Sequence, residues 1–391
     1  MKYNFDEPFC RYGTVCEKYD NNKEVFGRED IIPLWIADTD FKTPDFIVNA
    51  IKSRIEHPSF GYSFRCKYFY EAARSWVWRR NNWDAKLEWF GFTPGVVCGI
   101  SYGINSFTAP GDKILIQPPV YPPFARTIIA NNRVVVNNPL IETEGTYEID
   151  FIDFEEKLKE VKLFILCNPH NPTGRVFTYD ELKKMGELCV KHGVYIVSDE
   201  IHADLVFANH KHIHIASISE EIANITLTYF APSKTFNVAG FSTAIAVIPN
   251  PEMRAMYEAC ANQIHVDQGN IFGAVATRAA YNNGDEWVDE LNVYLEANAD
   301  FTIDYLKANM PKIKCNKPES TFLLWLDCRE LGLTQEELCD FMLNKAHLGL
   351  NNGEMFGEEG VGFVRLNIGT QRAVLTKALE QLKDAYLKLG F

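Results

Sequence analysis

The stretch ITLTYFAPSKTFNVAG, residues 225–240, decides how the rest of this chain is interpreted. Its first part, Thr226–Phe230, has the apolar and β-branched composition of a buried strand. Its second part is small and polar and places Lys234 between a serine and a threonine. An ammonium group at the end of a core strand is costly to bury without a partner. The placement therefore predicts that other polar groups of the chain meet this lysine.

Short apolar runs alternate with helix-like stretches between about residues 90 and 250. Several runs are apolar on both faces, as strands covered by helices on both sides should be. One intervening helix has clear ends, because Thr178 and Glu181 form a capping-box pair and Gly193 follows a basic last turn. The pattern predicts βαβ units and a mainly parallel sheet. The expected strands are 113–117, 134–136, 163–167, 194–198, 226–230 and 244–248.

The pattern changes near Asp285. A helical periodicity over 286–310 ends at Pro311, and two strand-like runs with two further helices follow it. We expect those runs at 321–326 and 362–366, and the helices near 334–345 and from Arg372 onward. The predicted organisation is a large domain, 46–285, a small α+β domain, 286–391, and an N-terminal segment, 1–45, that packs against the small domain.

The bulk composition excludes several classes of protein. The chain has 391 residues and a net charge of −13, so no basic surface for nucleic acid or anionic membrane is expected. No apolar run approaches the roughly 18 residues of a membrane span, and MKYNFDEPFCRYG lacks the pattern of a signal peptide. The ten cysteines form no C-x-x-C pair, which favours reduced thiols and a cytoplasmic location.

Polar side chains follow several of the expected strands, and ligands of open α/β sheets collect at the carboxyl ends of the strands. A proline-rich loop with Tyr121 follows the first of them, NPHNPTG with Asn171 follows 163–167, and Asp199 follows 194–198. Upstream, TPGVV (93–97) has the turn expected where a helix N-terminus faces an anion.

These residue types fit pyridoxal 5′-phosphate (PLP). A lysine amine can bond covalently to an aldehyde cofactor, and a carboxylate can keep a pyridine nitrogen protonated. An amide can hydrogen-bond the phenolic oxygen, an aromatic ring can stack on the pyridine, and a helix N-terminus can hold the phosphate. The cofactor expected from this set is PLP.

Four motifs resemble those of the fold-type I PLP enzymes of the aminotransferase class I/II family: NPHNPTG (168–174), SDEIHAD (198–204), APSKTFNVAG (231–240) and VRLNIGT (364–370). Five further stretches are similar to the PatB/MalY-type cystathionine β-lyases, or cysteine-S-conjugate β-lyases: PLWIADTDF (33–41), FGYSF (60–64), TPGVV, PPVYPPF (118–124) and SDEIH. The resemblance runs from Trp35 to the terminal helix. It implies an α/β fold with a mainly parallel seven-stranded sheet between helices and a smaller α+β domain.

The resemblance also implies roles for individual residues. Lys234 would bond to the cofactor and move the Cα proton, and Tyr121 or Lys234 would protonate the leaving sulfur. Arg365 would grip the substrate carboxylate as a bidentate fork. Tyr62 would reach the phosphate in the neighbouring subunit, which implies a homodimer with shared active sites. Asn171 and Tyr62 would also contact the substrate.

The remaining implied contacts are to the cofactor. Asp199 would pair with the pyridine nitrogen, and Asn171 with the ring hydroxyl oxygen. His202 stands where many aminotransferases have a tyrosine that contacts the same oxygen. The other contacts are Tyr121 stacked on the ring, and Ser233 with the backbone amides of Val96 and Val97 at the phosphate.

The expected function is cleavage of cystathionine or a related cysteine S-conjugate to pyruvate, ammonia and a thiol. An aminotransferase that acts on an amino acid and a 2-oxo acid is the alternative, because both reactions begin with loss of the Cα proton. A purely regulatory cofactor-binding protein is a third hypothesis, which a complete catalytic set disfavours. The shared motifs do not separate the first two.

One further pattern is H-x-H-x-H, formed by His210, His212 and His214. On a strand the three side chains would share one face, which suggests a metal site. The stretch ANHKHIHI (208–215) contains no acidic or cysteine partner, and the cofactor chemistry needs no metal. We therefore expect a solvated loop and no metal site.

Overall fold

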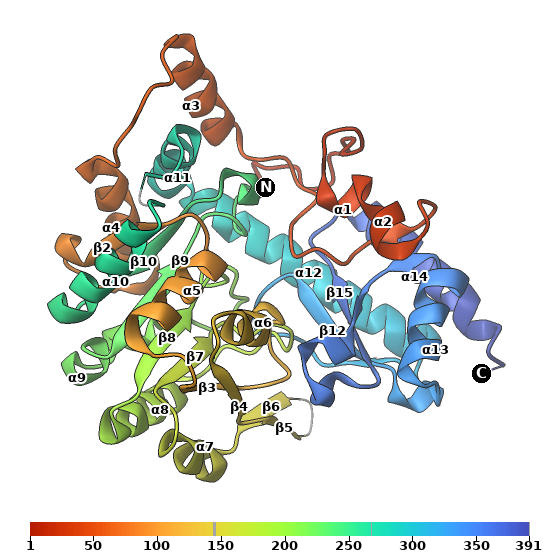
Figure 1. The fold of residues 1–391 in the computed structure, drawn as a ribbon. Coiled ribbons are helices and arrows are strands. Elements are labelled where there is room, and N and C mark those ends of the chain that lie inside the picture. The colour runs from red at the N-terminus through yellow and green to blue at the C-terminus, as the bar shows by residue number, and fades with distance from the viewer. Residues whose placement is uncertain (144–145, 267, 391) are drawn as a thin grey trace.

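A seven-stranded sheet with helices on both faces forms the centre of the protein (Figure 1). The structure is a computed structural model that describes residues 1–143, 146–266 and 268–390. The strand order is β2-β10-β9-β8-β7-β3-β4, and only β10 runs antiparallel to its neighbours. The predicted mainly parallel sheet is confirmed. Its strands are β2 Phe90–Thr93, β3 Lys113–Ile116, β4 Val134–Asn137, β7 Leu163–Cys167, β8 Tyr195–Asp199, β9 Thr226–Phe230 and β10 Ala244–Val247.

Strand β7 shows why these segments are apolar on both faces. Ile165 packs into a core that contains residues of α5, α6 and α10, whereas Phe164 and Leu166 pack into a core that contains residues of α7 and α8. Successive side chains of a strand point to opposite faces, so a central strand needs apolar residues at every position. These helices are α5 Val96–Phe107, α6 Pro123–Ala130, α7 Phe151–Leu158, α8 Tyr179–His192 and α10 Pro251–Gln263.

The ends of α8 agree with the sequence signals. The Thr178 hydroxyl accepts from the Glu181 amide at 3.2 Å, and the Glu181 carboxylate accepts from the Thr178 amide at 2.7 Å. Gly193 takes the left-handed conformation, with φ of 66°, just after the helix. Both groups satisfy backbone atoms that helix ends leave without partners.

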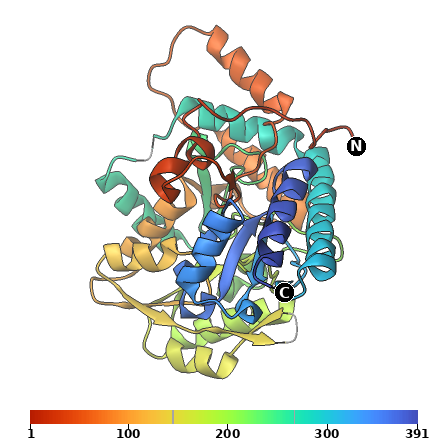
Figure 2. The same cartoon turned by 90° about the vertical axis from the view of Figure 1, so that its right-hand side faces the viewer.

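The long helix α12 connects the central sheet to a C-terminal four-stranded antiparallel sheet (Figures 1 and 2). A parallel pair, β1 with β13, joins the N-terminal segment to this part of the chain. One apolar cluster continues from α4 through α12 into the C-terminal sheet, so the proposed division into domains stays a prediction. The elements are β1 Ile32–Pro33, α12 Asp285–Asn309, β11 Lys314–Cys315, β12 Leu323–Asp327, α13 Gln335–Asp340 with a π-helical turn Phe341–Lys345, β13 Leu348–Gly349, β14 Asn351–Asn352, β15 Phe363–Asn367 and α14 Arg372–Leu387.

The remaining elements lie around this frame. Helix α3 projects from the body of the protein, and α1 and α2 lie beside the C-terminal part (Figure 1). Within the described ranges, no helix is long and apolar enough to cross a membrane. These elements are α1 Glu17–Asp20, α2 Asn22–Phe26, α3 Asp45–Glu56, α4 Lys67–Asn81, the hairpin β5 Leu140–Thr143 and β6 Thr146–Ile149, α9 Glu220–Ala223 and α11 Ile271–Asn283.

Candidate active site

Three neighbouring strands bring their carboxyl ends to one edge of the sheet. Cys167 of β7 pairs with Asp199 of β8, and Asp199 pairs with Tyr229 of β9. Asp199 is the last residue of its strand, one position beyond the predicted end. The loops that follow β7 and β9 carry Asn171 and Lys234. The predicted polar groups therefore do meet at the edge where ligands of α/β sheets bind.

Lys234 lies in the loop after β9 with its side chain partly buried. Its Nζ donates to the Ala37 carbonyl oxygen at 2.6 Å. Burial lowers the pKa of this amine; the carboxylates of Asp38 and Asp199 oppose the shift, and Arg365 adds to it. An amine with a lowered pKa is more often neutral, which a nucleophile or general base requires.

Asp199 is a buried carboxyl group, 3% exposed, with little to stabilise its charge. Its Oδ1 accepts from the Ile201 amide at 3.1 Å. Burial raises the pKa of Asp199 to about 7, and the backbone bond and Lys234 oppose the shift only in part. A cation held next to this carboxyl would restore its charge. A protonated pyridine nitrogen is such a cation, so the site fits the expected cofactor.

Arg365, on β15, is buried among neutral oxygens. Its guanidinium donates to the Asn171 side chain at 3.0 Å, the Asn351 side chain at 2.6 Å and the Trp35 carbonyl at 2.8 Å. Its Nε is buried and has no hydrogen-bond partner among residues 1–143, 146–266 and 268–390. Burial lowers the pKa of Arg365 to about 10. Within the described structure this guanidinium forms no ion pair with a carboxylate, so it can receive the carboxylate of a ligand.

Tyr121 and His202 belong to the same group of side chains. Burial and the charge of Asp199 raise the pKa of Tyr121 to about 12, and Arg365 opposes the shift. Burial, Lys234 and Arg365 lower the pKa of His202 to about 3, so its imidazole is neutral. The Nδ1 of His202 is buried and has no hydrogen-bond partner in the part of the chain that the structure describes. A buried polar atom without a partner is costly, and a ligand atom can satisfy it.

The N-terminus of α5 offers donors for an anion. The helix begins at Val96 after Gly95, and no side chain caps its first turn. The amides of Val96 and Val97 lie in that turn, where backbone N–H groups have no partner within the helix. These donors and the helix dipole suit a phosphate. Ser233, partly buried, immediately precedes Lys234.

Tyr62 is a predicted site residue for which the described structure shows no contact with this group. Its side chain is 99% exposed, in the segment before α4. Phe64, in the same segment, is 85% exposed. The role expected for Tyr62 requires a second subunit, so a single chain does not test it.

The segment 35–40 forms a wall of the site that the sequence did not reveal. Trp35 and Ala37 position Arg365 and Lys234 through backbone carbonyl oxygens, which leave no signal in a sequence. The charged side chains of this segment were visible, however. Asp38 and Asp40 stand two residues apart between apolar neighbours and could have been recognised as groups that need partners.

Two cations from the N-terminal segment pair with those carboxylates. Arg11 lies 2.6 Å from Asp38 and 2.7 Å from Asp40, and Lys18 lies 2.9 Å from Asp40. The Lys18 side chain is fully buried. This network of four charges fixes the segment that holds the amine of Lys234.

The prediction of a solvated loop at the H-x-H-x-H motif is wrong for two of its residues. His212 and His214 are 2% and 1% exposed, and both rings hydrogen-bond the Glu200 carboxylate. The acidic partner was missing from the local sequence because it comes from the end of β8. Glu200 lies 12 and 14 positions before the two histidines in the chain, and tertiary folding brings it into contact with them.

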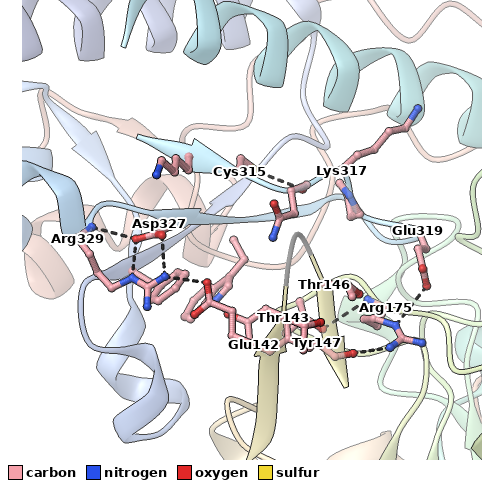
Figure 3. A pocket seen from close by; sticks show the side chains of 16 residues that line it. Glu142, Thr143, Thr146, Tyr147, Arg175, Cys315, Lys317, Glu319, Asp327 and Arg329 are labelled. Carbon is pink, nitrogen blue, oxygen red and sulfur yellow. Dashed lines mark hydrogen bonds and ion pairs between the residues drawn. The ribbon is translucent and has the colours of Figure 1, made fainter. Parts of the chain in front are cut away.

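A separate cavity lies between the β5–β6 hairpin and the C-terminal sheet (Figure 3). Its charged side chains are already paired: Arg329 bonds Asp327 and Glu142, and Arg175 bonds Glu181. None of the predicted site residues lines it.

Comparisons with known proteins agree with this geometry. The family model for aminotransferase class I and II matches residues 36–382. Cystathionine beta-lyase PatB of Bacillus subtilis is 43% identical and aligns with 98% of this chain and 99% of its own length. Cystalysin of Treponema denticola, whose crystal structure contains PLP, superposes with a TM-score of 0.96 at 32% identity, over the full length of both chains (100% of each).

A third similar protein is named for a different activity. A PLP-bound protein of Clostridium difficile 630, named as an aminotransferase, superposes with a TM-score of 0.97 at 44% identity. The match covers 98% of this chain and 100% of the other. The two solved structures thus both contain PLP, and the names of the three proteins differ in the activity that they give.

Proposed function

This chain belongs to the aminotransferase class I and II family, and we propose that it is a PLP-dependent carbon–sulfur β-lyase. The substrate class is cystathionine or a related cysteine S-conjugate, and the products are pyruvate, ammonia and a thiol. The observation that carries the proposal is the meeting of Lys234, Asp199 and Arg365 at one sheet edge, in a chain 43% identical to a cystathionine β-lyase.

The residues around the cofactor would each hold one part of it. Lys234 is the amine that bonds to its aldehyde, Asp199 the carboxylate that faces its ring nitrogen, and Tyr121 the ring that stacks on it. His202 and Asn171 offer side-chain atoms to the ring oxygen. Val96, Val97 and Ser233 offer donors to the phosphate. Bound PLP supplies an electron sink for negative charge at the substrate Cα.

Residues of the chain carry out the proton transfers and the binding. Arg365 receives the α-carboxylate, which fixes the direction of the Cα–H bond. Lys234, with its lowered pKa, takes the Cα proton. Tyr121 keeps its phenolic proton because its pKa is raised to about 12, so it can protonate the departing sulfur. A thiol with a pKa near 8.5 is already a good leaving group.

The active unit in this proposal is a homodimer with shared sites. Tyr62 and its aromatic neighbours Phe60 and Phe64 are 99%, 54% and 85% exposed, and large apolar side chains exposed this close together in the chain favour an interaction surface. In the dimer Tyr62 would reach the phosphate or substrate of the other subunit. A Tyr62→Phe protein mixed with a Lys234→Ala protein should then form hybrid dimers with one intact site and regain partial activity. A fully active monomer in light scattering would contradict the shared site.

The aminotransferase remains the second candidate because the similar Clostridium difficile protein carries that name. One assay separates the two reactions. With cystathionine we expect pyruvate, ammonia and homocysteine in equal amounts, at a rate that 2-oxoglutarate leaves unchanged. Strict dependence on a 2-oxo acid, with no thiol released from cystathionine, would establish the aminotransferase instead. Alanine with 2-oxoglutarate serves as the substrate pair without a leaving group.

A further inference from the structure

A buried cluster of metal-ligating side chains lies outside the cofactor site. Glu200 follows Asp199 at the end of β8. Its carboxylate contacts the last two histidines of the H-x-H-x-H motif, His212 and His214. All three residues are at most 2% exposed. One ligand atom of each lies within 4.8 Å of the other two. The roles proposed for the cofactor site use none of these side chains.

The donor atoms of the cluster converge on one point. Glu200 Oε2 lies 3.0 Å from Nε2 of His212 and in contact with Nδ1 of His214. The two imidazole rings stand nearly perpendicular, with an interplanar angle of 87°, so each directs a nitrogen at the carboxylate from a different side. Two imidazole nitrogens and one carboxylate oxygen are a donor set that Zn²⁺ takes in proteins.

Further contacts orient the Glu200 carboxylate and the His214 ring. Glu200 Oε1 accepts from the Ser198 hydroxyl at 2.7 Å, which leaves Oε2 for the histidines. The Trp83 ring lies 4.5 Å from the His214 ring, centroid to centroid, and limits its rotation. Outer contacts that orient the ligands are typical of metal sites.

The cluster is buried and has a carboxylate at its centre. A buried carboxylate is strongly unfavourable unless it is paired and hydrogen-bonded, and a metal cation that also binds the two imidazoles supplies such a partner.

We propose that Glu200, His212 and His214 bind one divalent transition-metal cation, with Zn²⁺ as the best fit. Bonds of about 2.0–2.2 Å place the ligand atoms of a tetrahedral ion about 3.4 Å apart, so His212 has to move about 0.4 Å away from the carboxylate and His214, which lies closer to it, has to move further. With three protein ligands, the ion keeps one position for a further ligand. The ion ties the 206–214 segment to the strand end that carries Asp199.

The third histidine of the motif provides a matched control. The His210 side chain is 39% exposed, and its Nδ1 lies 3.9 Å from Glu319 rather than in the cluster. A His210→Ala variant therefore removes an imidazole two residues from the site and leaves the site intact.

The test measures metal in the PLP-loaded protein from zinc-supplemented cultures. We expect about one zinc per chain by elemental analysis in the wild type and in His210→Ala. His214→Gln and Glu200→Gln should lose at least about tenfold of the zinc. Cofactor absorbance of the same samples keeps this result separate from the proposed function. A wild type without zinc that also fails to bind added Zn²⁺, or equal zinc in all variants, would overturn the proposal.

Cobalt substitution provides a second measurement that needs no variant to fold. The ten cysteines are alternative ligands for a metal. Co²⁺ bound by nitrogen and oxygen shows visible d–d bands without the thiolate charge-transfer band of cysteine ligation. We expect the first spectrum, together with a rise in Tm on binding, because an ion that binds only the folded state stabilises it. A thiolate band, or no band, would contradict the assignment.

Discussion

Two walls of the candidate active site differ in how their buried polar groups are paired. The sheet-edge wall consists of the residues that end or follow β7, β8 and β9, and the N-terminal wall consists of segment 35–40 with Arg11 and Lys18. On the sheet-edge wall, the His202 Nδ1 has no hydrogen-bond partner among the described residues, and the carboxylate of Asp199 accepts from the backbone amide of Ile201. On the N-terminal wall, Asp38 and Asp40 are paired with Arg11 and Lys18 at 2.6–2.9 Å. The first wall therefore has buried polar groups that a ligand could pair with, whereas the carboxylates of the second wall are already paired with cations of the chain.

The difference indicates what each wall is for. A buried polar group without a partner costs about 1–3 kcal/mol, so it is retained where a ligand completes it. A buried charge network with every member paired holds one geometry. Changes in the sheet-edge wall should therefore affect turnover at nearly constant stability. Changes in the N-terminal wall should affect stability first.

The largest effect is expected for Lys234→Ala. In the proposed function this change removes both the covalent attachment of the cofactor and the base for the Cα proton, so kcat/KM should fall by more than about 1,000-fold. Thiol and pyruvate release measure the loss, and Lys42→Ala at an exposed position is the control. Reduction of the holoenzyme with borohydride followed by peptide mapping should label Lys234. A label on another lysine would refute the assignment.

Asp199→Asn should be the next largest change. The substitution is almost isosteric, but it removes the charge that faces the cofactor nitrogen in the proposed function. A loss of about 3–4 kcal/mol in transition-state stabilisation is expected, or about 10²–10³-fold in kcat. Thermal unfolding of the variant should stay close to that of the wild type. Near wild-type elimination by this variant would exclude the role.

The N-terminal wall is tested by Lys18→Met. Removing a fully buried cation leaves Asp40 only partly compensated, so the free energy of unfolding should fall by about 3 kcal/mol. The exposed pair Lys42–Glu7 is the matched control, and Lys42→Met should cost less than about 1 kcal/mol. Urea unfolding measures both. Equal effects in the two variants would show that burial of the network carries no extra stability.

The smallest effect is the dependence of the same network on pH. Burial opposes ionisation of Asp40, but Lys18 and Arg11 outweigh it and keep the pKa of this carboxyl below its usual value. Ionised Asp40 therefore stabilises the fold above pH of about 4, and the contribution is lost as the pH falls through the lowered pKa. The difference in stability between wild type and Asp40→Asn should be constant from pH 8 to about 5 and shrink below about 4. A difference that grows in acid would reverse the sign.

The sequence predicted six of the seven strands of the central sheet, all but β2, and most of the group of side chains. Strands such as Leu163–Cys167 and Thr226–Phe230 match their predicted bounds, because a central parallel strand needs apolar residues on both faces. Asn171, Asp199 and Lys234 were found because strand ends of a parallel sheet share one edge. Arg365 was found through a motif alone.

Contacts between polar groups that are far apart in the chain could be seen only in the tertiary structure. The carbonyls of Trp35 and Ala37 became ligand-site contacts, and Glu200 became the partner of His212 and His214. Backbone atoms are the same at every residue, so a sequence cannot mark the ones that matter. The histidines were predicted to be solvated because a local pattern contains no information about a carboxylate that the fold brings from another strand. Local periodicity determines elements, and the packing of elements determines which buried charges find partners.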